Sequence, residues 1–320
     1  MSFQGIEEAF NRISNVVNKT AVMTSRTLNS LLNAKIYFKC ENFQRVGAFK
    51  FRGAYNALSL LSKESKKRGV ITHSSGNHAQ AVALAASILG IKATIVMPKG
   101  APTNKIKATK DYGAQIVFCD NSLEARSQIT EKLIEKYNYK LIHPYDDNDI
   151  ICGQGTAAYE LIKEIGELNI VIAPLGGGGL LSGTALAAKG LCPEVQIFGV
   201  EPSMADDAYR SIQAGYIIES TYPETIADGL RTSLCERTFT IIQKFVDQIV
   251  TVSEKEIINA MRFLWERMKI IIEPSGSVSL AALLSNKINT KNMKVGIILS
   301  GGNIDIAPFF QLLEKRVVQS

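Results

Sequence analysis

Gly176-Gly177-Gly178-Gly179 joins the apolar run Ile170-Val171-Ile172-Ala173-Pro174-Leu175 to the helix-like run from Leu180 to Ala188. The apolar run has the length and composition of a buried strand, so four glycines follow a strand and open a helix. Because glycine has no side chain, the backbone N–H groups can converge, and the helix dipole adds positive potential. The pattern predicts a bound phosphate; the alternative is a flexible turn between strand and helix.

The phosphate need not belong to a nucleotide. The loop lacks the G-x-G-x-x-G spacing of dinucleotide sites and the Gly-Lys-Ser/Thr ending of P-loops. The uncharged span 169–188 has the length of a membrane helix, but Pro174 and the glycines disfavour one.

The composition is that of a globular protein with a large core. The 320 residues are 46% hydrophobic, and 36 basic against 30 acidic residues give a net charge of +6. The charges are spread along the chain, which suits small anionic ligands and disfavours nucleic acid. Five dispersed cysteines without a C-x-x-C pair indicate neither a disulfide framework nor a zinc site. The polar, amphipathic N-terminus predicts a cytoplasmic protein.

Strand-like and helix-like segments alternate along the chain, which predicts an α/β protein with doubly wound parallel sheets. We expect a small domain at 68–146, inserted into a large domain made of 1–67 and 147–320. After the insertion, a helix is expected from Gly155 to Ile165. The expected strands are 35–40, 70–72, 93–97, 115–118, 140–142, 170–175, 195–200 and 295–299.

Lys50 lies between Phe49 and Phe51 at the start of an expected helix. Desolvation and the positive helix end would lower the pKa of its amine and favour the neutral form, which can form a Schiff base. The alternative is an ordinary surface lysine.

Three further polar turns follow expected strands. The turn 74–78 precedes a helix whose free N–H groups could hold a carboxylate, or it is a simple N-cap. Glu201 and Asp207 could hold Mg²⁺ or Ca²⁺, although spacing alone favours a helix cap. The turn 300–303 ends the last strand. With 176–179, these turns should meet at the carboxyl edge of the sheets, where ligands gather in such folds.

Several motifs together resemble a known family. They are Ala48-Phe49-Lys50-Phe51-Arg52-Gly53-Ala54, the turn from Ser74 to Gln80, the tetraglycine, Glu273-Pro274-Ser275-Gly276 and Ser300-Gly301-Gly302-Asn303. From Asn11 to Phe310 the chain resembles the fold-type II pyridoxal-phosphate enzymes, whose fold is that of the tryptophan synthase β subunit. Within them it is similar to the serine racemases and serine/threonine dehydratases.

The resemblance implies that Lys50 carries pyridoxal 5'-phosphate, that Phe49 packs on its ring and that Asn77 bonds the ring hydroxyl. Ser300 would face the ring nitrogen. The implied phosphate-binding residues are Gly176, Gly177, Gly178, Gly179 and Leu180, and the implied substrate-binding residues are Ser74, Ser75, Asn77, His78 and Arg126.

Ser300 has a chemical consequence of its own. A hydroxyl cannot keep a pyridine protonated as an aspartate would, so the cofactor is a weaker electron sink. Removal of the substrate Cα proton is then coupled to reprotonation from the other face or to loss of a β-hydroxyl. Racemisation and dehydration are expected to compete at one site.

Other positions distinguish the relatives. Racemisation needs a proton donor opposite Lys50, and dehydratases of the threonine type usually have alanine where this chain has Ser75. By the same resemblance, Glu201, the Ala205 carbonyl and Asp207 form a site for Mg²⁺, Ca²⁺ or Mn²⁺, which reverses the preference for a cap. Tyr145 stands where animal racemases carry asparagine, whereas eliminases and some racemases have an aromatic residue there.

The predicted function is a serine racemase that also eliminates water from serine, giving pyruvate and ammonia. The first alternative is an L-serine/L-threonine or threo-3-hydroxyaspartate ammonia-lyase. The second is a non-catalytic amino-acid or cofactor-binding protein, which the presence of Lys50 and Ser75 disfavours. A homodimer is expected by resemblance. ATP activation is not expected, because the stretch 44–48 replaces the hydroxyl-bearing residues near the animal nucleotide site.

Overall fold

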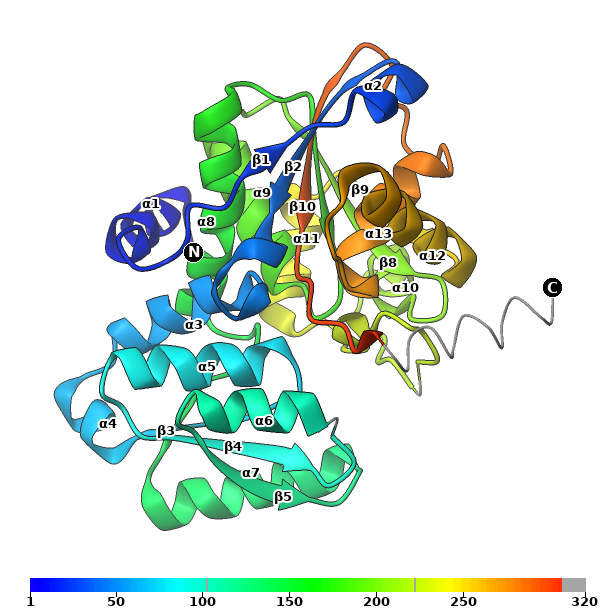
Figure 1. Cartoon of the computed structure of the whole chain (residues 1–320). Helices are drawn as coiled ribbons and strands as arrows, with labels where there is room; N and C mark the ends of the chain where they lie inside the picture. Colours follow the sequence, from blue (N-terminus) through cyan, green and yellow to red (C-terminus); the bar gives the residue numbers. More distant parts are fainter. Residues whose placement is uncertain (102, 222, 307–320) are drawn as a thin grey trace.

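The computed structural model describes residues 1–101, 103–221 and 223–306. Residue 102, residue 222 and residues 307–320, which include the ends of the resemblance and of the predicted large domain, lie outside the described residues. The structure contains two sheets, each flanked by helices. In the view of Figure 1 the larger sheet lies above the smaller one. No helix among the described residues has both the length and the apolar character needed to cross a membrane.

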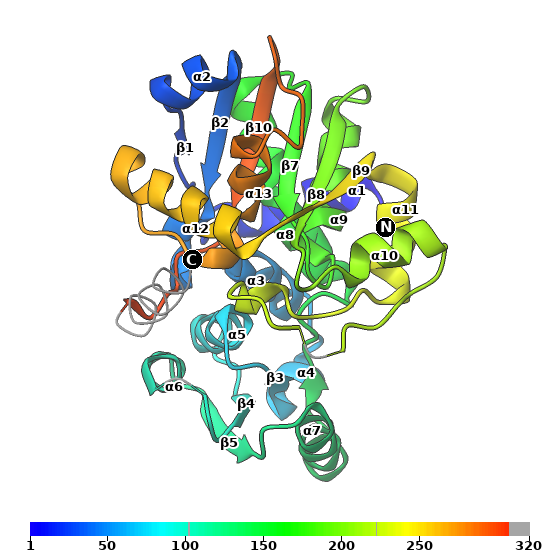
Figure 2. The same ribbon diagram turned by 90° about the vertical axis from the view of Figure 1, so that its right-hand side faces the viewer.

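The larger sheet has six strands. Its order is β1 (Val22–Met23), β2 (Lys35–Cys40), β10 (Lys294–Leu299), β7 (Ile170–Pro174), β8 (Gln196–Pro202) and β9 (Gln248–Val252). The edge strand β1 pairs antiparallel with β2, and all the other pairs are parallel. Figure 2 shows the sheet with helices on both of its faces. The predicted α/β fold with parallel sheets is confirmed.

β7 is apolar throughout because both of its faces are buried. Ile170 and Ile172 belong to the core on one face, whereas Val171 and Ala173 belong to the core on the other. The first core is closed by α2 (Arg26–Leu32), α12 (Glu254–Phe263) and α13 (Pro274–Leu284). The second is closed by α1 (Phe3–Ile13), α8 (Asn148–Ile165), α9 (Gly179–Leu191) and α11 (Glu236–Phe245).

The smaller sheet has four parallel strands in the order β5 (Gln115–Cys119), β4 (Ala93–Pro98), β3 (Val70–His73) and β6 (Lys140–Leu141). Its strands all fall within 68–146, the range that stays our prediction for the small domain. The chain enters this part through α4 (Lys63–Arg68), and the helices that follow are α5 (Asn77–Ile88), α6 (Thr103–Asp111) and α7 (Leu123–Tyr137). α3 (Lys50–Ser59) packs against both α5 and α8.

α8 begins earlier than the sequence predicts. It starts at Asn148 instead of Gly155, because the Asp147 carboxylate accepts hydrogen bonds from the N–H groups of Asp149 and Ile150. Such a cap satisfies donors that the first helical turn leaves unpaired.

Four charged side chains are buried together between β2, α3 and α8. Arg52 Nε lies 2.7 Å from Glu41 Oε2, and Arg52 Nη1 lies 2.7 Å from Glu160 Oε1. Lys39 Nζ lies 2.7 Å from Glu160 Oε2. All four side chains are at most 5% exposed, and the two cations balance the two carboxylates. The cluster ties Lys39 of β2 and Glu41 just after it to Arg52 of α3 and Glu160 of α8.

We expect Arg52→Met to lower the free energy of unfolding by about 3–5 kcal/mol, because it leaves two buried carboxylates without their main partner. Urea unfolding followed by circular dichroism measures the change. The control is Arg262→Met, which breaks an exposed 2.7 Å pair with Glu266 and should leave the unfolding midpoint unchanged. Equal midpoints for both variants would contradict a structural role for the cluster.

Candidate active site

Lys50 is the first residue of α3, and the chain just before it is held by the end of β10. Ala48 forms an antiparallel bridge with Gly301, and the Phe49 N–H donates to the Ser300 carbonyl over 3.0 Å. Lys50 Nζ lies 5.1 Å from the centroid of the Phe49 ring and donates to the Pro144 carbonyl over 2.9 Å. Burial lowers the pKa of the Lys50 amine to about 8, although the Glu273 charge opposes the shift. The amine is therefore accessible in its neutral form near physiological pH.

The tetraglycine opens α9, as predicted. Gly178 has φ +86°, and a Cβ at any of the four positions would lie within 3.0 Å of a neighbouring atom. At Gly177 that neighbour is the Tyr145 ring, at 2.4 Å, and at Gly176 it is the Leu230 backbone, at 2.9 Å. Leu180 follows in the first helical turn and is 5% exposed. Close packing on every side disfavours the alternative of a flexible turn.

Asn77, at the start of α5, is held between two polar residues from late in the chain. Its Nδ2 donates to both carboxyl oxygens of Glu273, at 2.9 and 3.2 Å, and its Oδ1 accepts from Asn303 Nδ2 at 2.9 Å. Burial and the nearby Asp228 charge raise the pKa of the Glu273 carboxyl to about 8. The sequence motifs contained Glu273 and Asn303 but gave them no role; both orient the Asn77 amide.

The turn 74–78 connects β3 to α5. The Gly76 N–H donates to Ser74 Oγ over 3.2 Å, and the helix starts without a side-chain cap. A simple N-cap is therefore not what these serines form. His78 is 3% exposed, and its Nε2 lies 3.0 Å from the Ile142 carbonyl. Because a carbonyl only accepts, that nitrogen carries the hydrogen, and the neutral ring presents a lone pair at Nδ1, which has no partner among the described residues.

The three histidines of the chain converge near Lys50, although their spacing in sequence suggested no ligand set. The rings of His73 and His143 are 6.3 Å apart, and His143 lies edge-on to Tyr145 at 4.7 Å. Burial lowers the pKa of His143 to about 4, and burial and the Arg126 charge lower that of His73. The Arg126 Nε is buried without a hydrogen-bond partner among the described residues. The histidines meet because β3 and β6 are neighbours.

The predicted metal ligands lie where β8 leads into α10 (Asp207–Ala214). Glu201, Ala205 and Asp207 are at most 4% exposed. Glu201 Oε1 accepts from the Tyr209 N–H over 2.6 Å, so this carboxylate does cap the helix. Asp207 Oδ2 has no hydrogen-bond partner among the described residues. No cluster of three or more His, Cys, Asp or Glu that could hold a metal was found within them.

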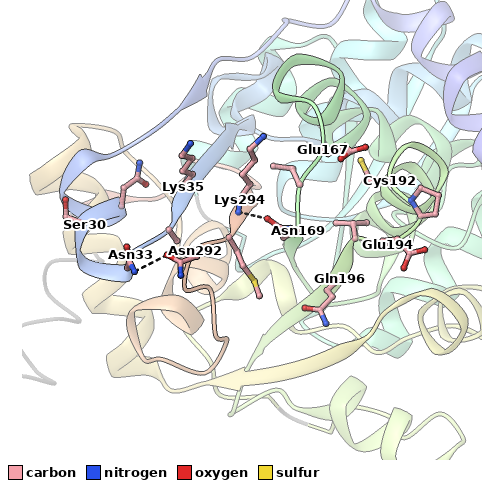
Figure 3. A pocket seen from close by; sticks show the side chains of 16 residues that line it. Ser30, Asn33, Lys35, Glu167, Asn169, Cys192, Glu194, Gln196, Asn292 and Lys294 are labelled. Atoms are coloured by element: carbon pink, nitrogen blue, oxygen red, sulfur yellow. Dashed lines mark hydrogen bonds between the residues drawn. The ribbon is translucent and has the colours of Figure 1, made fainter.

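A cavity of about 1140 Å³ lies elsewhere, at the amino ends of the larger sheet's strands. Figure 3 shows Lys35, Asn169, Gln196 and Lys294 around it. It contains none of the predicted site residues. The opposite, carboxyl edge is the candidate active site, because the buried lysine, the glycine loop and the histidines with lowered pKa values meet there.

These residues fit pyridoxal phosphate. A buried lysine with a lowered pKa suits a covalent bond to an aldehyde, and a glycine loop at a helix start suits a phosphate. Ser300, which is 3% exposed at the end of β10, supplies a hydroxyl beside them. Asp207 with Glu201 and the Ala205 carbonyl offers hard oxygens, but two carboxylates are fewer than many such sites use.

Comparison with known proteins agrees with this chemistry. The family model described as pyridoxal-phosphate dependent enzyme matches residues 13–301. The chain is 52% identical to L-threo-3-hydroxyaspartate ammonia-lyase of Saccharomyces cerevisiae, over 98% of this chain and 97% of the relative. It is 47% identical to serine racemase of Dictyostelium discoideum, over 98% of each chain.

The fold agrees as well. The structure of maize serine racemase superposes with a TM-score of 0.94 at 42% identity, and the match covers 99% of this chain and 98% of that one. The chain therefore belongs to the fold-type II pyridoxal-phosphate-dependent enzymes, in the group that contains the serine racemases and the hydroxyaspartate ammonia-lyases.

Proposed function

We propose that the chain is a serine racemase that also eliminates water from serine to give pyruvate and ammonia. The observation that carries this proposal is Ser75, a hydroxyl in the uncapped turn between β3 and α5. The turn leads directly into Asn77 and His78. The pKa of His78 is lowered by burial and by the charge of Lys50, which lies close to it. A serine there gives the site a proton donor that an alanine could not provide.

In this proposal each residue has one role. Pyridoxal phosphate, when bound, withdraws electrons from the substrate Cα and so makes its proton acidic. Phe49, Asn77, Ser300, Gly176 to Gly179 and Leu180 would hold the cofactor. The neutral Lys50 amine removes the Cα proton on one face, and Ser75 delivers a proton on the other. The N–H groups at the start of α5, including the backbone N–H of His78, and the Ser74 hydroxyl would bind the substrate carboxylate. A homodimer remains our expectation.

A second candidate, 3-hydroxyaspartate ammonia-lyase, is favoured by the cluster of Arg126, His73 and His143. This substrate has a second carboxylate, which needs a positive or hydrogen-bond-donating partner. His143 Nδ1 accepts from the Asp146 N–H over 2.8 Å, so its neutral ring keeps the hydrogen on Nε2 and can donate. The name of the yeast relative agrees with this reading.

The racemase proposal is tested by Ser75→Ala. We expect formation of D-serine from L-serine to stop, while pyruvate formation from L-serine largely survives, because Lys50 still removes that proton. Pyruvate formation from D-serine should fall. Four rates, those of pyruvate and of the opposite enantiomer from each serine isomer, are measured in parallel with Ser74→Ala. That variant removes a hydroxyl that shapes the same turn and should lower all of them together. Unchanged racemisation in Ser75→Ala would remove the reason for preferring a racemase.

The second candidate is tested by Arg126→Ala. If Arg126 binds the extra carboxylate, kcat/KM for L-threo-3-hydroxyaspartate should fall about 10–100-fold, because a hydrogen bond to a charged group is worth about 1.5–3 kcal/mol. The value for L-serine should change little. Keto acid is measured from both substrates and from L-threonine, with the exposed Arg68→Ala as control. Equal losses for both substrates would assign Arg126 to the shared α-carboxylate instead.

The metal remains a proposal that rests on Glu201, the Ala205 carbonyl and Asp207. Chelation should lower the melting temperature, because an ion that binds only the folded state stabilises it by about 2.7 kcal/mol at a hundred times its Kd. Adding Mg²⁺ or Ca²⁺ should restore the wild type but not Asp207→Asn. If chelator and added ion have no effect on the wild type, Glu201 serves only as the helix cap.

A further inference from the structure

α8 is packed against both helices that begin at the candidate site. A Cβ at Gly153 would lie 2.6 Å from the Arg52 carbonyl of α3, and one at Gly155 would lie 2.6 Å from the Gly183 carbonyl of α9. The backbones therefore touch on both sides of the residue between these glycines, which is Gln154. Because α3 begins at Lys50 and α9 begins at the glycine loop, Gln154 lies between the two functional helix starts.

The Gln154 side chain is fully buried and reaches both of those starts. Its Nε2 donates to the Pro144 carbonyl over 3.2 Å, the same oxygen that accepts from Lys50 Nζ over 2.9 Å. Its Oε1 lies 2.6 Å from the position of a Cβ on Gly179. The reverse orientation of the amide would set two oxygens against each other at Pro144, so this orientation is the one that fits.

The carboxamide is costly at this position. Its Oε1 has no hydrogen-bond partner among the described residues, and burying an unpaired carbonyl lowers the stability of the fold. A leucine of similar size would avoid that cost. What the glutamine provides and a leucine does not is the N–H bonded to Pro144.

We propose that Gln154 is a positioning residue that holds the Pro144 carbonyl in place as the acceptor for the Lys50 amine. This proposal rests on the proposed role of Lys50. The carbonyl of Pro144 fixes the amine, and Gln154 fixes the carbonyl from inside the core, against the first residue of α9. Lys50 and the glycine loop are more than 120 residues apart in sequence. The contacts of Gln154 with the Pro144 carbonyl and with Gly179 fix their relative positions.

Other contacts hold the same segment, so the effect of losing Gln154 should be local. The N–H groups of Tyr145 and Asp146 donate to His143 Nδ1, and Asp146 pairs with Arg237 at 2.8 Å. These contacts keep the segment folded but do not bear on the Pro144 carbonyl. The charged and titratable neighbours of Lys50, namely Glu273, His78 and His143, are left in place as well.

The test is Gln154→Leu, with Gln154→Met as a second variant in case the branched side chain prevents folding. The matched control is Asn56→Leu. Asn56 is a 1% exposed amide in α3 that donates to the Asp149 carbonyl of α8 over 2.7 Å, so it also bonds a backbone carbonyl of this helix pair, away from Lys50.

Two quantities are measured on protein freed of cofactor. The first is the pH dependence of Lys50 acetylation by acetic anhydride, quantified on the Lys50 peptide by mass spectrometry. The second is the dissociation constant of added pyridoxal phosphate, followed by absorbance. In the wild type the midpoint should lie near the Lys50 pKa of about 8.

Without its fixed acceptor the ammonium form loses stabilisation, so both Gln154 variants should shift the acetylation midpoint down by about one unit. Their cofactor dissociation constant should rise about tenfold, whereas Asn56→Leu should change only the melting temperature. A wild-type midpoint and dissociation constant in the Gln154 variants would overturn the proposal.

Borohydride reduction of the cofactor-loaded wild type makes the bond between lysine and cofactor permanent, and peptide mapping then shows which lysine carries this label. The experiment distinguishes failure of the proposed role of Lys50 from failure of the proposed role of Gln154. A label on another lysine would contradict the proposed role of Lys50 itself. A label on Lys50 together with an unmoved midpoint would contradict only the role of Gln154.

Discussion

The buried cluster of Lys39, Glu41, Arg52 and Glu160 constrains the rest of the structure. A buried charge is tolerated only when its partners are in contact, so these side chains permit one arrangement of the elements that carry them. Arg52 follows Lys50 by two residues, within the first turn of α3. The position of Lys50 is therefore set in part by the buried ion pairs of Arg52. The buried charges thus act by fixing the relative positions of β2, α3 and α8.

Elements with a clear hydrophobic period could be predicted from sequence. The strand at 35–40 and the helix that follows the tetraglycine have the expected places, because both depend on local pattern. The start of α8 was missed because the acidic stretch 144–149 has the composition of a turn, and Gly153 and Gly155 do not by themselves indicate a helix interior. In the structure they are points where backbones touch, which only the neighbouring helices reveal. β9 and α11 were not anticipated at all.

The candidate site could be predicted where the residue type and its local sequence indicate a chemical role, as for Lys50 and the glycine loop. It was not predictable where a residue acts through another. Glu273 contacts Asn77 across 196 positions of sequence, and nothing near either residue signals the partner. The same holds for Gln154, whose local sequence suggests only a helix. Supporting residues are defined by tertiary contact, so they become visible only once the fold is known.

The bridge between Ala48 and Gly301 joins an early segment to one of the last described segments, and β10 lies between β2 and β7 in the sheet. A chain in which β10 has not yet joined the sheet lacks this middle strand, so the β1–β2 pair and the β7–β8–β9 strands are not connected to each other. The segment before Lys50 then lacks its backbone contacts with Ser300 and Gly301. The candidate cofactor site is therefore complete only after β10 has entered the sheet, which makes this site a late product of folding.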